Sequence, residues 1–189
     1  MLDPKGQFGS EEYQLDRKAT ALKRAGDWDG AIAALRRRKE IMGLEWVDDK
    51  LAKYLQQAGR FDEAMAEIQW LLDHTHAQAQ ASLSQRPASM LLWHRTQRRG
   101  QFHASAALIC KRAKRPDLQA EHERQRDACM RLVEKIEPVA RADDKALRQA
   151  WEAARASGPQ AMQELSEARN AQIARNQALA DGTTKETAA

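Results

Sequence analysis

The sequence predicts an all-α fold, and two observations carry this prediction. The first is composition: of 189 residues, 31% are charged and 5% aromatic, and only nine are glycine and five proline. Alanine and straight-chain residues lose little conformational freedom in a helix, so a chain rich in them favours helices. The sequence has few runs of β-branched residues that could form strands. The second observation is an internal repeat.

Two stretches of the chain repeat each other without a gap. Residues 22–35 read LKRAGDWDGAIAAL and residues 55–68 read LQQAGRFDEAMAEI, at a constant offset of 33 residues. The corresponding pairs are Leu22/Leu55, Ala25/Ala58, Gly26/Gly59, Trp28/Phe61, Asp29/Asp62, Ala31/Ala64 and Ile32/Met65. A period of this length is typical of stacked supersecondary units.

Each repeated stretch predicts a helix, a tight turn and a second helix. A glycine at Gly26 or Gly59 permits the left-handed backbone that often ends a helix. Asp29 then falls in the first turn of the next helix, where a negative charge is favourable. Ala31 is small where two helices must approach closely, and Ile32 continues the apolar stripe. The repeat therefore predicts antiparallel helix hairpins.

These units resemble tetratricopeptide repeats, in which two antiparallel helices occupy about 34 residues. The resemblance covers residues 12–44 and 45–78, with Arg38 at a position where the family usually has alanine. Gly100 and Phe102 repeat the glycine–aromatic spacing, 41 residues after Gly59, and predict the turn of a third hairpin. The resemblance implies an α-solenoid of about three hairpins with a C-terminal helical cap.

This reading divides the chain into four parts. We expect a flexible N-terminus at 1–10, repeats at 11–116, a helical extension or cap at 117–180 and a disordered tail at 181–189. Within the extension, Pro138 is expected to interrupt one helix and Pro159 to open the last one, to about residue 180.

In the tetratricopeptide family the first helices of the pairs line a concave groove. The resemblance therefore implies that this groove is lined here by Tyr13, Lys23, Arg24, Trp46, Lys53, Gln57, Met90, His94 and Arg98. Trp46 and Met90 are the expected apolar anchors for a partner, although packing in the core is an equal alternative for Trp46. Asp16 and Asp49 stand where cations would be needed for a carboxylate clamp, which disfavours that form of recognition.

The segment 86–115 is strongly basic: eight Lys or Arg residues and no acid lie between Asp73 and Asp117. Besides Arg98, the basic surface is expected to include Arg95, Arg99, Lys111, Arg112, Lys114 and Arg115. Three interpretations stay open: a solvated face, a docking surface for an acidic protein segment, or contacts to a nucleic-acid backbone. A turn at Gly100 would divide these charges between the two ends of the third hairpin.

The sequence shows no pattern of a catalytic, cofactor or metal site. It has no phosphate-binding glycine loop, no nucleophile elbow and no His-Glu-x-x-His motif. His74 and His76 are two residues apart, so on a helix they do not share a face. Cys110 and Cys129 form no motif and are expected to be small core residues. We therefore expect a non-enzyme without cofactor or metal.

Features of membrane or secreted proteins are also missing from the sequence. It has no 18-residue apolar run, and its first residues, MLDPKGQFGSEEY, lack the apolar core of a secretory signal. The expected location is cytoplasmic, with no membrane partner.

The favoured functional prediction is a non-catalytic scaffold or adaptor that binds a peptide or partner protein, possibly acidic, in a helical groove. The alternative is a nucleic-acid-associated regulator that uses segment 86–115. A third hypothesis is self-assembly through the C-terminal helix, and the oligomeric state stays open.

Overall fold

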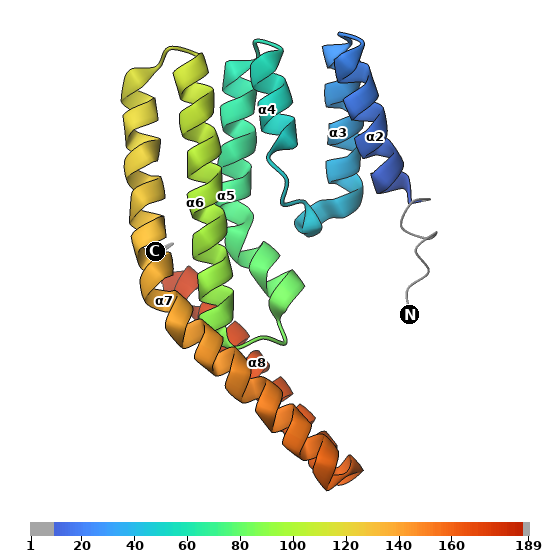
Figure 1. Cartoon of the computed structure of the whole chain (residues 1–189), viewed down its shortest axis with the longest axis vertical. Helices are drawn as coiled ribbons and strands as arrows, with labels where there is room; N and C mark the ends of the chain where they lie inside the picture. Colours follow the sequence, from blue (N-terminus) through green and yellow to red (C-terminus); the bar gives the residue numbers. More distant parts are fainter. Residues whose placement is uncertain (1–9, 187–189) are drawn as a thin grey trace. The chain divides into compact units, whose positions relative to one another are not determined.

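The structure is a computed structural model that describes the backbone of residues 10–186 and the side chains of residues 10–174. Figure 1 shows helices α2 (Glu11–Arg24), α3 (Trp28–Met42), α4 (Lys50–Gln57), α5 (Phe61–Leu83), α6 (Ala88–Arg112), α7 (Pro116–Ser157) and α8 (Pro159–Glu186), with a 3-10 turn, η1 (Gly43–Glu45), before α4. No strand occurs among residues 10–186, which confirms the all-α prediction.

The chain forms two compact units. Unit 1 holds the chain up to Ser82 together with Arg95–Val133, and unit 2 holds Leu83–His94 together with the chain from Glu134 onward. Helices α6 and α7 therefore contribute to both units. The division does not follow the predicted border between repeats and cap near residue 116.

The first two hairpins of unit 1 follow the sequence prediction. Helix α2 lies beside α3, and α4 lies beside α5 (Figure 1). At the first turn Gly26 has φ of 82°, and the Asp27 N–H donates to the Leu22 carbonyl at 3.0 Å. At the second turn Gly59 has φ of 79°, and the Arg60 N–H donates to the Leu55 carbonyl at 2.9 Å. Both helices end in the same glycine-dependent motif.

The third turn lies elsewhere than predicted. Helix α6 runs without a break through Gly100, so the predicted turn at Gly100 and Phe102 is wrong. The chain instead turns between α6 and α7, where the Arg115 N–H donates to the Cys110 carbonyl at 2.9 Å. Lys114 takes the left-handed position with φ of 56°, which an L-residue adopts at a cost of about 1–2 kcal/mol.

Gly100 has a packing role in place of a turn role. It is buried in α6, and a Cβ atom at this position would lie 3.3 Å from both Cys129 Cβ and Met130 Sδ of α7. The missing side chain therefore allows the two helices to approach closely within unit 1.

The main apolar core lies in unit 1. Its largest fully buried side chains include Trp46, Leu35, Leu55, Ile68 and Ile109. Trp28 and Phe61, the aromatic residues of the two repeated turns, pack against this core while staying partly exposed. Cys110 is also buried, as predicted for a small core residue. Whether the hairpins wind into a solenoid stays a prediction.

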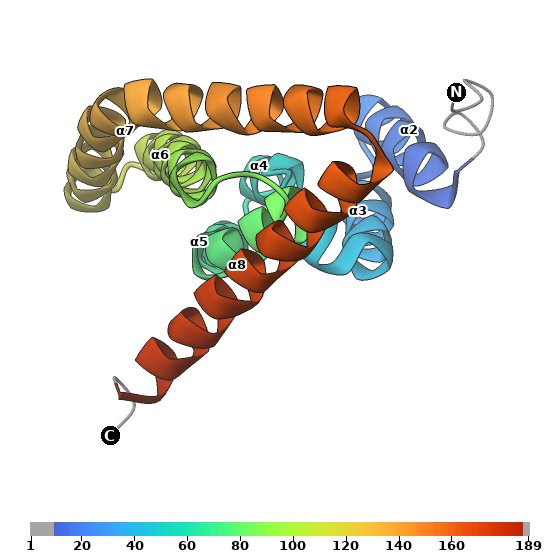
Figure 2. The ribbon, with the colours of Figure 1, turned by 90° about the horizontal axis from the view of Figure 1, so that it is seen from below.

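Unit 2 is built from the start of α6, the end of α7, and α8. Pro138 lies inside α7, so the predicted interruption there is wrong; the helix continues although a proline removes one backbone donor. Gly158, with φ of 110°, makes the turn into α8, which begins at Pro159 as predicted (Figure 2). Helix α8 continues to Glu186, beyond the expected end near residue 180. Residues 1–9 and 187–189 of the expected flexible ends lie outside the described residues.

Candidate binding surfaces

An ion-pair network joins the first helices of unit 1. Arg38 Nη1 donates to Asp16 Oδ1 at 3.0 Å and to Asp48 Oδ2 at 3.2 Å, which links α3 with α2 and with the segment before α4. Lys50 Nζ donates to Asp16 Oδ1 at 2.9 Å and to Thr20 Oγ1 at 3.0 Å. Arg38, the departure from the family pattern, thus supplies charge that balances two carboxylates on this face.

Trp46 is a core residue, which corrects its prediction as a groove anchor. Its side chain is 0% exposed, and its indole N–H donates to Glu67 Oε1 at 3.0 Å. Glu67 is itself buried and also accepts from Lys39 Nζ at 2.7 Å. Gln78 donates to the Trp46 carbonyl at 2.7 Å. A residue enclosed in this way cannot contact a partner.

A groove of about 580 Å³ lies between α4 and α6 in unit 1. Its walls are formed by Val47, Asp48, Asp49, Lys53, Gln101, Phe102, Ala104 and Ser105. Lys53 pairs with Asp49 at 2.7 Å, and the Ser105 hydroxyl donates to the same carboxylate. Since Asp48 pairs with Arg38, both acids of the groove already have cationic partners within the chain. Lys53 is the predicted groove residue that this site includes.

The other predicted groove residues of unit 1 do not line this groove. Tyr13 is half-buried, and Arg24 and Gln57 are exposed. Lys23 Nζ lies 4.9 Å from the ring centre of Tyr54, in a cation–π contact. Arg98 is half-buried, and this burial lowers the pKa of its guanidinium.

Met90 and His94 belong to unit 2, where both line a separate pocket of about 270 Å³. The nine residues predicted to share one groove are therefore divided between the two units. Sequence reasoning missed Trp93 and Asp144 in this pocket. Asp144 is buried and ion-paired with Arg86, 58 residues away, and no sequence signal indicates a contact over that separation.

Because α6 has no turn at Gly100, the basic residues around Gly100 lie along a continuous helix and are not exposed at a hairpin end. Arg99 Nη1 donates to the Leu72 carbonyl at 3.1 Å, and Arg95 Nη1 lies 3.3 Å from His76 Nδ1, so both contact α5. Four exposed cations gather at the α6–α7 turn, Lys111, Arg112, Lys114 and Arg115, whereas the exposed Arg86 is paired with Asp144. The predicted division of charge between the two ends of a hairpin that turns at Gly100 is thus corrected: the four cations at the α6–α7 turn form one cluster, which we call the basic turn.

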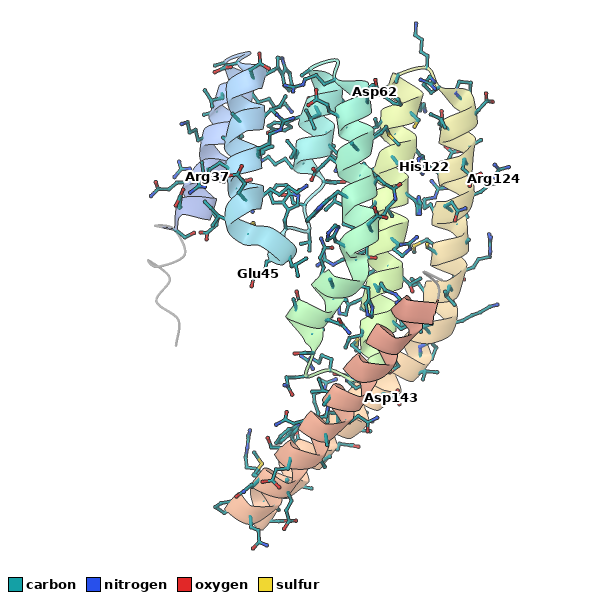
Figure 3. All side chains as sticks on the ribbon, turned by 180° about the vertical axis from the view of Figure 1, so that it is seen from behind. Arg37, Glu45, Asp62, His122, Arg124 and Asp143 are labelled. Atoms are coloured by element: carbon teal, nitrogen blue, oxygen red, sulfur yellow. The ribbon has the colours of Figure 1, made fainter. Side chains whose placement is uncertain are left out.

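A histidine pair lies between α6 and α7 in unit 1. His103 Nδ1 and His122 Nδ1 are 3.1 Å apart, and His122 extends from α7 toward α6 (Figure 3). Burial, the neighbouring His122 and then Arg99 lower the pKa of His103 to about 4, against a smaller opposite effect of Glu121. Burial also lowers the pKa of His122. Both rings are therefore neutral near pH 7.

Among the described side chains of residues 10–174, no three His, Cys, Asp or Glu residues come together as a metal-binding group. In the same part of the chain, no helix has both the length and the apolar character needed to span a bilayer. No family model, curated protein or solved structure matches this sequence.

Proposed function

We propose that this chain is a non-catalytic binding protein that holds a segment of a partner protein in the groove between α4 and α6. The observation that carries this proposal is the groove of about 580 Å³ between α4, the first helix of the second hairpin, and α6. Its volume lies in the range of about 300–1,000 Å³ that is usual for ligand sites. The resemblance to tetratricopeptide repeats supports the same class of function.

The groove is prepared for binding because its charged side chains already have partners. Asp48 is held by Arg38, and Asp49 by Lys53 and Ser105. Groups fixed before binding lose less conformational freedom when a ligand arrives. This arrangement favours a segment that places a small apolar side chain against Val47 and makes hydrogen bonds to the groove walls.

The test is to select peptides of about 12 random residues against the whole protein by phage display and to retest them on variants. Ala104→Arg should fill the groove and weaken binding at least about tenfold, because Ala104 lies in its wall. Ala33→Arg, an exposed position on α3, serves as the matched control and should leave the dissociation constant unchanged. Circular dichroism should show both variants folded. Peptides that bind Ala104→Arg as tightly as the unmodified protein would contradict the groove assignment.

The basic turn supports a second candidate function, the binding of a nucleic-acid backbone. Its four cations, Lys111, Arg112, Lys114 and Arg115, are exposed within five consecutive residues. Four phosphate contacts predict that affinity falls about 100-fold between roughly 50 and 200 mM salt. A mobility-shift titration at both salt concentrations measures this dependence.

The control for this second candidate is a matched pair of charge reversals. Lys111→Glu with Arg112→Glu should abolish the shift, whereas Arg17→Glu with Lys18→Glu changes two exposed neighbouring cations on α2 and should not. No shift at low salt, or equal losses from both double variants, would reject nucleic-acid binding at this turn.

A further inference from the structure

The pocket of about 270 Å³ in unit 2 has features of a site for a small ligand. It is lined by Leu83, Arg86, Met90, Trp93, His94, Ala140, Arg141, Asp144 and Arg148. These residues come from the end of α5, the α5–α6 connection, the start of α6 and the second half of α7. All of them lie in unit 2, so a ligand in this pocket is independent of the function proposed for the groove of unit 1.

One part of the pocket wall is apolar and contains a buried hydrogen-bond donor that has no partner. Leu83, Met90, Trp93 and Ala140 supply this part, and the indole N–H of Trp93 is buried without a hydrogen-bond partner. A buried unpaired donor costs roughly 1–3 kcal/mol, and tryptophan usually finds an acceptor.

The other part of the wall carries excess positive charge. Asp144 is buried and holds two arginines, Arg86 at 2.8 Å and Arg148 at 3.2 Å. Each guanidinium has five N–H donors in a planar fork. One carboxylate cannot accept from all of them, so Arg86 and Arg148 both keep donors that do not bind Asp144. Arg141, the third arginine of the lining, is paired with Glu137, to which its Nε donates at 2.7 Å. Three arginines therefore stand against two acids at this wall. Asp144 thus orients cations toward the pocket without neutralising them.

We propose that this pocket binds a carboxylate attached to a small apolar group. The carboxylate accepts from Arg148 at the exposed rim and from the N–H groups of Arg141 that do not donate to Glu137, and the apolar group contacts Met90 and Trp93. Guanidinium forks match a carboxylate in geometry as well as in charge. A pocket of about 270 Å³ is near the lower limit for ligand sites, so it suits an acid of about ten heavy atoms.

Phenylacetate and its neutral analogue phenylacetamide are probes of suitable size. The full chain, labelled with 5-fluorotryptophan, has five tryptophans, and Trp93→Phe assigns the fluorine resonance of Trp93 in NMR spectra. Phenylacetate should shift this resonance with a dissociation constant on the order of 10⁻⁴ to 10⁻³ M. The amide should bind at least about tenfold more weakly, because it lacks the charge.

Variants locate the site on the protein. Arg148→Gln and Arg141→Gln should each weaken phenylacetate binding several-fold, whereas Arg155→Gln, an exposed arginine of α7 outside the pocket, should not. Once the Trp93 resonance is assigned, the comparison of acid and amide uses the unmodified sequence, so it decides the question even if Arg148→Gln or Arg141→Gln fails to fold. No shift of the Trp93 resonance with millimolar acid, or equal binding of acid and amide, overturns the proposal.

A third probe distinguishes two ligands that carry the same groups, a free small acid and the C-terminus of a protein. A short peptide that ends in phenylalanine carries an apolar group beside a free carboxylate. Tighter binding of this peptide than of phenylacetate assigns the pocket to a protein terminus, and weaker binding assigns it to a free small acid. Either result supports the carboxylate chemistry, provided that amidation of the peptide or acid weakens binding.

Discussion

Acid should weaken the packing of α6 against α7, because a histidine pair is buried between these helices. The Nδ1 atoms of His103 and His122 are 3.1 Å apart, which requires one ring to donate a hydrogen and the other to accept it. Protonation of both rings places two donors against each other and breaks this bond. Arg99 and Glu121 are the other charged groups that act on His103.

The magnitude follows from the pKa of His103. Its folded-state pKa is about 4, and its unfolded value is about 6.5. Because the folded value is the lower one, the unfolded chain takes up the proton first. Stability is complete above about pH 6.5, falls by about 1.4 kcal/mol per pH unit and stops falling below about pH 4. The difference of about 2.5 between the two pKa values sets an upper limit of about 3.5 kcal/mol, and the loss is smaller where water screens the ring.

Urea denaturation followed by circular dichroism, at several values from about pH 7.5 to pH 4.5, measures this loss. Carboxylates also titrate in this range, so the decisive quantity is a difference between proteins. His103→Asn should be less stable near neutral pH but show a flatter pH dependence than the unmodified chain. His74→Asn, which removes a histidine of α5 outside the pair, should keep the original slope. An unchanged slope in His103→Asn would refute this account of the pair.

Substitutions at four other positions test the packing of unit 1. Lys114→Gly should raise stability by about 0.5 kcal/mol or more, because glycine adopts the left-handed backbone without strain, whereas Gly59→Ala should lower it by about 1 kcal/mol; thermal melts compare them. Glu67→Ala should cost about 2–4 kcal/mol in urea denaturation, since it leaves Trp46 and Lys39 without their buried acceptor, and Glu67→Gln should cost less. Arg38→Ala should cost about 1–3 kcal/mol, and equal stability of this variant would show that the ion-pair network does not hold α2 and α3.

The sequence predicted the first two hairpins because their turns depend on a local requirement. A left-handed residue at the end of a helix favours glycine wherever it occurs, so Gly26 and Gly59 mark both turns. The same rule failed at Gly100, since glycine also occurs in helices where a neighbouring helix approaches closely. It failed again at Lys114, where the hydrogen-bonded motif that ends α6 has a left-handed residue although the residue is not glycine.

The candidate sites were less predictable than the hairpins, because they depend on contacts between distant segments. Lys53 lies in the wall of a groove, but its neighbours Gln101 and Ser105 come from a helix whose turn the sequence misplaced, and a role of Lys53 in binding stays a prediction. The sequence around Trp46 does not distinguish a buried indole that donates to Glu67 from an exposed anchor for a partner. The sequence predicted which residues share a face of a helix. Which faces pack against each other could be seen only in the structure.

The close approach at Gly100 limits how the length of this protein can change. Gly100 precedes Lys114 by 14 residues, and Cys129, which its missing side chain accommodates, follows Lys114 by 15 residues. One residue inserted into either arm would rotate that helix face by about 100° and bring a side chain into the contact. Insertions and deletions between residues 100 and 129 are therefore expected only as matched changes in both arms. The connection at residues 84–87, outside these arms, is free of this constraint and is the place where homologous chains are expected to differ in length.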